Sequence, residues 1–155
     1  MTSRWLSADE DRAWRSYRQM FSGLEARLAQ EMVEESGLSM ADYSVLTNLV
    51  EADARHWRPT ELADHMHWSQ CRLSHQIRRM EERGLVAREP DPNDGRGSLV
   101  VITKAGVRAI AAAAPKHFEG VRAHLIDLLT PQQLESLAEI AQTVTNHLSK
   151  DAPAG

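Results

Sequence analysis

Cysteine is scarce in this chain: Cys71 is the only one among 155 residues. A single thiol excludes an intrachain disulfide framework and a CxxC pair, so a reducing, cytoplasmic setting is the default expectation. No apolar run approaches the ~20 residues that a membrane helix needs, and the N-terminal segment lacks the apolar core of a signal peptide. The sequence therefore predicts a protein without a membrane partner.

Catalytic signatures are also missing. The motifs GxSxG and HExxH and a glycine-rich phosphate loop do not occur, which argues against an enzyme. Neither a cofactor nor a metal is expected. His65, His67, Cys71 and His75 could be imagined as a metal cluster. However, the expected helix starts only at Ser69, so of these four residues only Cys71 and His75 would lie on it.

Composition and charge place the chain among ordinary soluble proteins. It is 42% hydrophobic and 26% charged, which predicts one globular domain or one compact unit with an extension. The net charge is −4, yet residues 55–104 hold nine Lys and Arg against seven Asp and Glu. This mildly basic centre between acidic flanks suggests a polyanionic partner for the centre alone.

The N-terminal third has the pattern of one long helix. Ser7 and Glu10 form a capping box, and the helix is expected to stop at Ser36-Gly37. At ~1.5 Å per residue such a helix is about 40 Å long, too long for a small globule to cover. A partner is therefore expected on its apolar face, which comprises Trp14, Tyr17, Phe21, Leu24 and Leu28.

The middle of the chain predicts three shorter helices and a β-hairpin. The helices begin after Ser39, at Pro59 and after Ser69, and the third ends at Gly84. Residues 85–88 and 98–103 have the pattern of strands, and residues 90–97 between them are rich in turn formers.

Helical patterns return after the hairpin. One helix starts at Thr103, and Pro115 is expected to kink it. A capping box at Thr130 opens the last helix, and residues 151–155 are expected to be a frayed tail. The apolar stripe of the last helix comprises Leu134, Leu137, Ala138, Ala141, Val144 and Leu148.

The segment from residue 60 to residue 106 combines two short helices and a hairpin, the pattern of a winged helix-turn-helix. At 100° per residue, Leu73, Ile77 and Met80 fall on one face of the second helix. The opposite arc carries Cys71, Arg72, His75, Arg78 and Arg79. An apolar face that packs and a basic face that is exposed are what a recognition helix needs to enter the major groove.

The hairpin tip offers a second contact with DNA. Arg96 lies between glycines on the tip, where it could insert into a narrow minor groove. Asp94 is expected to hold the Arg96 guanidinium in a bidentate pair.

These residues, taken in order, resemble the MarR family of multiple-antibiotic-resistance regulators from residue 5 to about residue 148. The resemblance rests on Glu61-Leu-Ala, on Ser69 followed by His75, on Met80 to Arg88, on Asp91 to Arg96, and on Leu99 to Gly106. It implies a mainly α fold with a small β-hairpin wing, in which residues 39–106 form the winged helix-turn-helix. Residues 1–38 and 107–150 would then form the helical dimerisation region.

The resemblance further implies a homodimer whose first and last helices interlock. It implies a regulator that binds a pseudo-palindromic duplex, acts as a repressor more often than as an activator, and is often released by a small molecule. The expected dimerisation residues are Trp5, Leu6, Leu24, Leu28, Leu134, Leu137, Ala141, Val144 and Leu148. The chain departs from the family pattern at His67 and Trp68, and its cysteine is not in the first helix, so peroxide sensing is not carried over.

Several residues keep alternative roles. Ser69 is a helix cap first and a phosphate contact second, and Gln70 and Gln76 could each read adenine. Arg78 and Arg79 could contact DNA or pair with the carboxylates at positions 81 and 82.

Other readings concern regulation. His75 could contact DNA or respond to pH, and Cys71 could be an oxidation switch or a small residue that tolerates close approach to DNA. Trp14, Tyr17 and Phe21 could line a pocket for a small aromatic ligand. The competing class is a winged-helix interaction module that binds protein or RNA.

Overall fold

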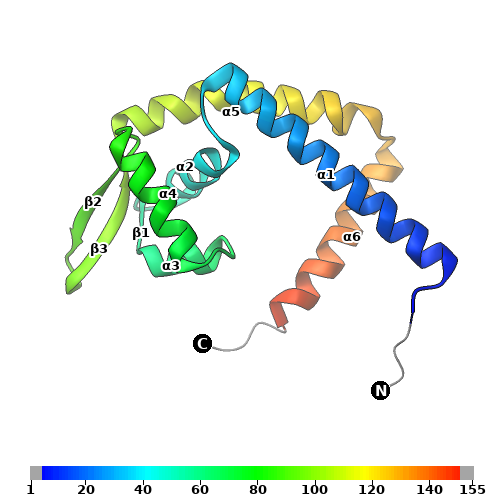
Figure 1. The fold of residues 1–155 in the computed structure, drawn as a ribbon, viewed down its shortest axis with the longest axis horizontal. Coiled ribbons are helices and arrows are strands. Elements are labelled where there is room, and N and C mark those ends of the chain that lie inside the picture. Colours follow the sequence, from blue (N-terminus) through cyan, green and yellow to red (C-terminus); the bar gives the residue numbers. More distant parts are fainter. Residues whose placement is uncertain (1–4, 151–155) are drawn as a thin grey trace. The chain divides into compact units, whose positions relative to one another are not determined.

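The computed structural model describes residues 5–150, and these are mainly helical with one small sheet (Figure 1). Met1–His117 and Phe118–Gly155 form two compact units. The expected frayed tail lies outside the described residues. No helix among residues 5–150 is both long and apolar enough to cross a membrane.

The first unit opens with α1 (Ala8–Ser36) and α2 (Met40–Glu51). Both have a complete capping box, with Ser7 opposite Glu10 and Ser39 opposite Asp42. Gly37 ends α1 in the left-handed region at φ 70°. The predicted start and end of α1 are therefore confirmed.

A helix-turn-helix and a three-stranded sheet follow. The elements are β1 (His56–Trp57), α3 (Pro59–His65), α4 (Gln70–Glu82), β2 (Val86–Asp91) and β3 (Asp94–Ile102). The sheet is antiparallel in the order β1-β3-β2. The hairpin is confirmed, but its strands run further toward the tip than predicted. Two-residue β1 was not predicted, because it has no periodicity to read.

The eight largest of the side chains that are less than 2% exposed form the centre of the core: Val45, Leu46, Leu49, Leu62, Leu73, Ile77, Met80 and Val100. They come from α2, α3, α4 and β3, so the sheet and the three helices share one core. The predicted inward face of α4 is confirmed. Full burial of such side chains contributes about 1.5–3 kcal/mol each.

Helix α5 (Lys104–His124) begins one residue after Thr103, where a helix start was predicted, and runs from the first unit into the second. It continues through Pro115, and the kink stays a prediction. The second unit adds a 3-10 turn, η1 (Ile126–Leu128), and α6 (Pro131–Lys150). Thr130 and Gln133 exchange the hydrogen bonds of the predicted capping box, at 3.2 and 2.9 Å.

Candidate nucleic-acid interface

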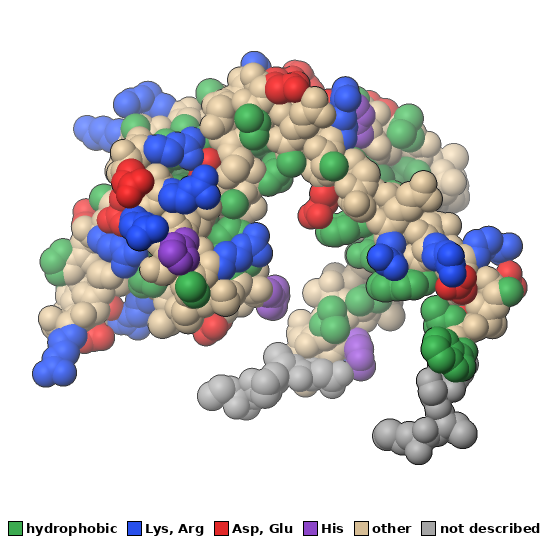
Figure 2. All heavy atoms as spheres, in the orientation of Figure 1, with side chains coloured by type: hydrophobic (Ala, Val, Ile, Leu, Met, Phe, Trp, Pro, Cys, Tyr) green, Lys and Arg blue, Asp and Glu red, His purple; other side chains and the backbone are tan. Residues whose placement is uncertain are grey.

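Helix α4 presents a basic face outward. Ser69 caps it, with Oγ accepting a hydrogen bond from the Arg72 amide at 3.1 Å. Lys and Arg side chains gather over α4 and the hairpin in Figure 2. The exposed residues on α4 include all but one of those predicted to contact DNA from this helix: Gln70, Arg72, His75, Arg78 and Arg79. Cys71, for which no DNA contact was predicted, is exposed as well.

Gln76 is the exception, and the prediction that it reads a base is wrong. Its side chain is 9% exposed, and Nε2 donates to Asp42 Oδ1 at 2.6 Å. At 100° per residue Gln76 lies only about 60° from Leu73, on the packed side of the helix. A buried amide needs a partner, and α2 supplies it.

Asp42 joins α4 to the start of α2. Its Oδ2 accepts from Arg83 at 2.6 Å and from the Ser39 amide at 2.9 Å. A second Arg83 nitrogen donates to the Gly37 carbonyl at 3.2 Å. Burial alone would raise the pKa of Asp42, but hydrogen bonds from Arg83 and Ser39, with the Arg83 charge, hold it below its ordinary value. The buried aspartate is therefore charged and fixes α4 against the turn that follows α1.

Contacts along α4 preorganise two of the basic side chains. The Arg72 guanidinium carbon lies 3.9 Å from the centre of the Trp68 ring, a cation–π arrangement. Arg78 donates to His75 Nδ1 at 3.3 Å, because arginine can only donate. The alternative partner Glu81 pairs instead with Arg88 at 3.2 Å.

The hairpin tip, here called the wing, carries Arg96 in a bulge. Strand pairing is regular from Val86↔Ile102 to Pro90↔Ser98, and the next pair is Asp91↔Asp94. Residues 95–97 therefore lie on β3 without a partner on β2.

Asp94 acts on the Arg96 backbone. Its Oδ1 accepts from the Arg96 amide at 3.1 Å, so the prediction that it pairs with the guanidinium is wrong. A short carboxylate satisfies a backbone amide two residues ahead more readily than a distant guanidinium. The Arg96 side chain is exposed at the tip.

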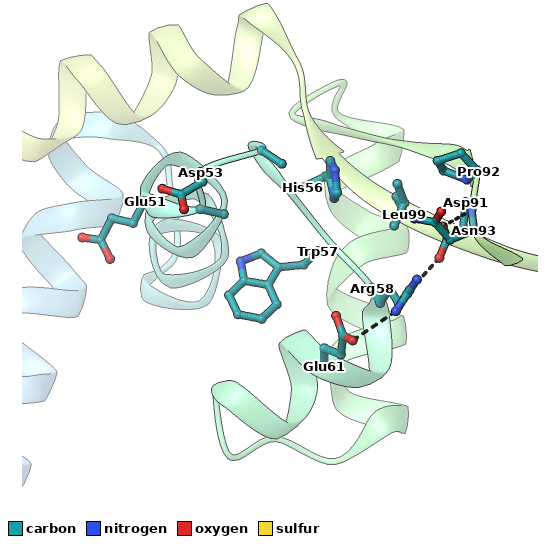
Figure 3. A pocket seen from close by; sticks show the side chains of 12 residues that line it. Glu51, Asp53, His56, Trp57, Arg58, Glu61, Asp91, Pro92, Asn93 and Leu99 are labelled. Atoms are coloured by element: carbon teal, nitrogen blue, oxygen red, sulfur yellow. Dashed lines mark hydrogen bonds and ion pairs between the residues drawn. The ribbon is translucent and has the colours of Figure 1, made fainter.

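An ion pair beside the bulge of the wing, shown in Figure 3, was not predicted from the sequence. Arg58 Nε donates to Asp91 Oδ2 at 2.6 Å, and Asp91 Oδ1 accepts from the Asn93 amide at 2.9 Å. The Asp91 side chain is 3% exposed and that of Arg58 is 43% exposed. The sequence Asp-Pro-Asn signals a turn, but the partner 33 residues earlier leaves no local signal.

A cavity of about 590 Å³ lies between α1, α2 and the start of α4. Its lining comprises Glu25, Leu28, Ala29, Met40, Ala41, Ser44, Trp68, Arg72 and His117. His117 also packs on Tyr43 with ring centres 4.7 Å apart, and burial lowers the pKa of His117.

The predicted aromatic ligand residues lie elsewhere on α1. Trp14, Tyr17 and Phe21 stack along the helix with ring centres 5.8 and 6.0 Å apart. They line a hollow formed by α1 residues alone, so the structure does not bring them to the cavity beside α4.

Each of the two units exposes an apolar surface on its terminal helix. On α1, Trp14, Tyr17 and Phe21 are about half exposed, and Trp5 and Leu6 before it are exposed as well. On α6, Val144, Leu148 and Ala141 are exposed, whereas Leu134 and Leu137 are half-buried, as are Leu24 and Leu28 on α1. These are the residues predicted to form a dimer interface, which stays a prediction.

The chain is similar to known proteins in both sequence and fold. The model of the MarR family matches residues 38–98. The crystal structure of Sco3205, a MarR family transcriptional regulator from Streptomyces coelicolor in complex with DNA, is 36% identical. The match covers 98% of this chain and 96% of that one, with a TM-score of 0.91.

Two further relatives agree. AbsC, a MarR family transcriptional regulator from Streptomyces coelicolor, is 38% identical, with a TM-score of 0.89 over 96% of this chain and 100% of that one. The transcriptional regulator HosA of Escherichia coli O111:H- is 28% identical over 88% of this chain and 96% of its own length. With this likeness over almost the whole length of both chains, the protein belongs to the MarR family, a class of transcriptional regulators and not of enzymes.

Proposed function

We propose that this protein is a cytoplasmic homodimeric repressor that binds a pseudo-palindromic duplex and is released by a small aromatic ligand. The observation that carries the proposal is the pairing of an outward basic face on α4 with Arg96 on the wing. A helix fits the major groove, and an arginine on a narrow tip suits the adjacent minor groove. The DNA complex of the 36% identical Sco3205 supports the same partner for this chain.

The two chains of a dimer would present two such surfaces. A twofold dimer places its recognition helices in major grooves about 34–36 Å apart, which requires two half-sites one helical turn apart. The exposed apolar residues of α1 and α6 are the surface that a second copy would cover.

Selection of genomic fragments at near-physiological salt tests the DNA proposal. Wild type should enrich a few palindromic sites, and Arg72→Ala/Arg96→Ala should lose at least about tenfold in affinity for them. A matched control, Arg12→Ala/Arg108→Ala, removes the same charge from exposed positions outside α4 and the wing. It should enrich the same sites as wild type.

Diffuse, salt-sensitive retention of DNA by all three proteins would mean generic attraction to phosphate. It would favour the alternative hypothesis of a winged-helix module that binds protein or RNA. Repression has its own test. A reporter driven by an enriched fragment should rise when the regulator gene is deleted, and a fall would indicate an activator.

The cavity beside α4 is the proposed ligand site, because Trp68 offers a ring to stack on and Arg72 a charge for an anion. Benzoate is a suitable probe, and it should weaken DNA binding by wild type. Ala29→Phe fills the cavity from α1 and should abolish the effect while unliganded DNA affinity stays near wild type. An equal benzoate response in both proteins would contradict this site.

A further inference from the structure

The wing is anchored to the start of α3 at the same residue where its strand register breaks. Asp91 is the last residue of β2, and β3 bulges opposite it to carry Arg96. Each Asp91 oxygen has a partner: Oδ2 accepts from Arg58 and Oδ1 from the Asn93 amide (Figure 3). One carboxylate thus ties the tip of the hairpin to the helix-turn-helix.

Arg58 lies where the sheet meets the helix-turn-helix. It follows β1 directly, and its backbone is the N-cap of α3. Strand β1 pairs with β3 at Trp57↔Val100. The edge strand of the sheet and the start of a helix therefore position the Arg58 backbone, and its side chain reaches Asp91 on the hairpin.

The remaining contact of Arg58 is weaker. Glu61 Oε1 lies 3.4 Å from the guanidinium and is 55% exposed, whereas Asp91 lies at 2.6 Å and is almost fully buried. Arg58 also holds the pKa of Asp91 below its ordinary value, with help from the Asn93 amide. Of the two carboxylates, Asp91 is the one whose position the arginine determines.

We propose that Arg58 and Asp91 are a positioning pair that sets the direction of Arg96 on DNA. Arg96 is fixed through its backbone, since Asp94 holds its amide and its side chain is exposed. Its reach into a groove then depends on where the bulge is held, and the bulge is held by Asp91. This inference rests on the proposed DNA-binding function and assigns no DNA contact to Arg58 or Asp91.

A double-mutant cycle on an enriched fragment tests the pair. Arg58→Gln should weaken binding by about 3- to 10-fold, and Arg96→Ala by about tenfold. Because the pair acts through Arg96, Arg58→Gln/Arg96→Ala should bind within about twofold of Arg96→Ala alone. Glu61→Gln, which removes the weaker carboxylate, should bind like wild type, and Arg58→Lys should recover part of the loss.

If the losses of DNA affinity caused by Arg58→Gln and Arg96→Ala multiply in the double variant, the proposal is overturned. Such a result would indicate a general loss of structure, which acts independently of Arg96. Asp91→Asn is a second variant, and it should repeat the behaviour of Arg58→Gln.

Amide hydrogen exchange, measured without DNA, tests whether the Arg58–Asp91 pair holds the wing. In free Arg58→Gln, the amides of Asn93 and Arg96 should exchange at least about tenfold faster, while those of α4 stay unchanged. Unchanged exchange at the tip would overturn the proposal even if DNA affinity fell. Absence of specific binding by wild type would refute the proposed function, whereas the exchange result would still decide whether the pair holds the wing.

Discussion

At the scale of single residues, the Asp42 carboxylate on α2 has three hydrogen-bond partners. It serves Gln76, Arg83 and the Ser39 amide. Asp42→Ala leaves the buried Gln76 amide without its acceptor and Arg83 without its charged partner, which should cost about 2–3 kcal/mol of unfolding free energy. The lower part of the range for a broken buried pair applies because Arg83 is 43% exposed. Urea unfolding measures the loss.

Asp9→Asn, at an exposed pair with Arg12, should change stability by less than about 0.5 kcal/mol. An equally small effect of Asp42→Ala would show that the shared carboxylate does not stabilise the fold.

The pKa of Asp42 also predicts how stability depends on pH. The folded pKa lies below the ordinary value of 3.8, so the contribution is present above about pH 4 and is lost as pH falls through the folded value. The difference in unfolding free energy between wild type and Asp42→Asn should therefore be largest near pH 7 and shrink below about pH 4. A difference that stays constant down to pH 3 would contradict the assignment.

The residues that end α3 and α4 offer a matched comparison. Both helices close with the same pair of backbone bonds, from His67 and Trp68 in one case and from Gly84 and Leu85 in the other. The left-handed residue is His67 at φ 54° in the first and Gly84 at φ 72° in the second.

A side chain is strained in this conformation, so opposite changes should have opposite signs. His67→Gly should raise the unfolding free energy by about 0.5–1 kcal/mol, and Gly84→Ala should lower it by about 1 kcal/mol. A Cβ at Gly84 meets nothing within 4 Å, so the loss is conformational. Chemical denaturation measures both, and two changes of the same sign would refute the account.

Residue roles were predictable where they depend on position along one helix. The exposed arginines and the buried Leu73, Ile77 and Met80 follow from a 100° step. Gln76 was misplaced because a glutamine on the packed side is stable only if another helix supplies a partner, and that partner is 34 residues away. The Arg58–Asp91 pair was missed for the same reason.

At the scale of elements, helix starts were the most predictable features. Ser7, Ser39 and Thr130 cap through bonds to a residue three positions ahead, so the whole signal lies within four letters. The strands were less predictable, because their length is set by pairing across the wing.

The cap of α4 allows its structural role to be separated from its expected role on DNA. Ser69→Ala loses the side-chain bond to the Arg72 amide and should cost about 1 kcal/mol. Ser69→Asp keeps a capping oxygen, so stability should stay within about 0.5 kcal/mol, but its charge would repel a phosphate at the helix start. Thermal unfolding and DNA titration measured together check this. Wild-type DNA affinity of Ser69→Asp would exclude a phosphate at that end.

Gly106 determines how closely α5 approaches the hairpin at the end away from its tip. A Cβ there would collide with the Leu85 carbonyl and lie 2.8 Å from Ile102 Cγ1. Gly106→Ala should therefore cost about 3 kcal/mol or more, since backbone must move. Gly23→Ala on α1, where nothing lies within 4 Å, should instead gain about 0.5–1 kcal/mol. Calorimetry at equal concentrations distinguishes them, and a tolerated Gly106→Ala would contradict the close approach.

At the scale of the whole molecule, the apolar surfaces of α1 and α6 imply a stability that depends on association. If a second copy covers them, the unfolding temperature should rise with protein concentration. Val144→Glu, at a half-exposed position, should abolish this dependence and yield a monomer by light scattering. Gln132→Glu, an exposed isosteric change on α6, is the control and should remain dimeric. A wild type that is monomeric at micromolar concentration would refute the dimer.

Because Trp68 stacks on Arg72, its fluorescence can report binding at this end of α4. Of the four tryptophans, Trp68 alone lines the cavity beside α4, and its ring lies under an arginine expected on DNA. In a variant with Trp5, Trp14 and Trp57 changed to Phe, all indole emission would come from this position. Duplex and cavity ligand would each alter the surroundings of the same fluorophore, so one label-free titration could follow both.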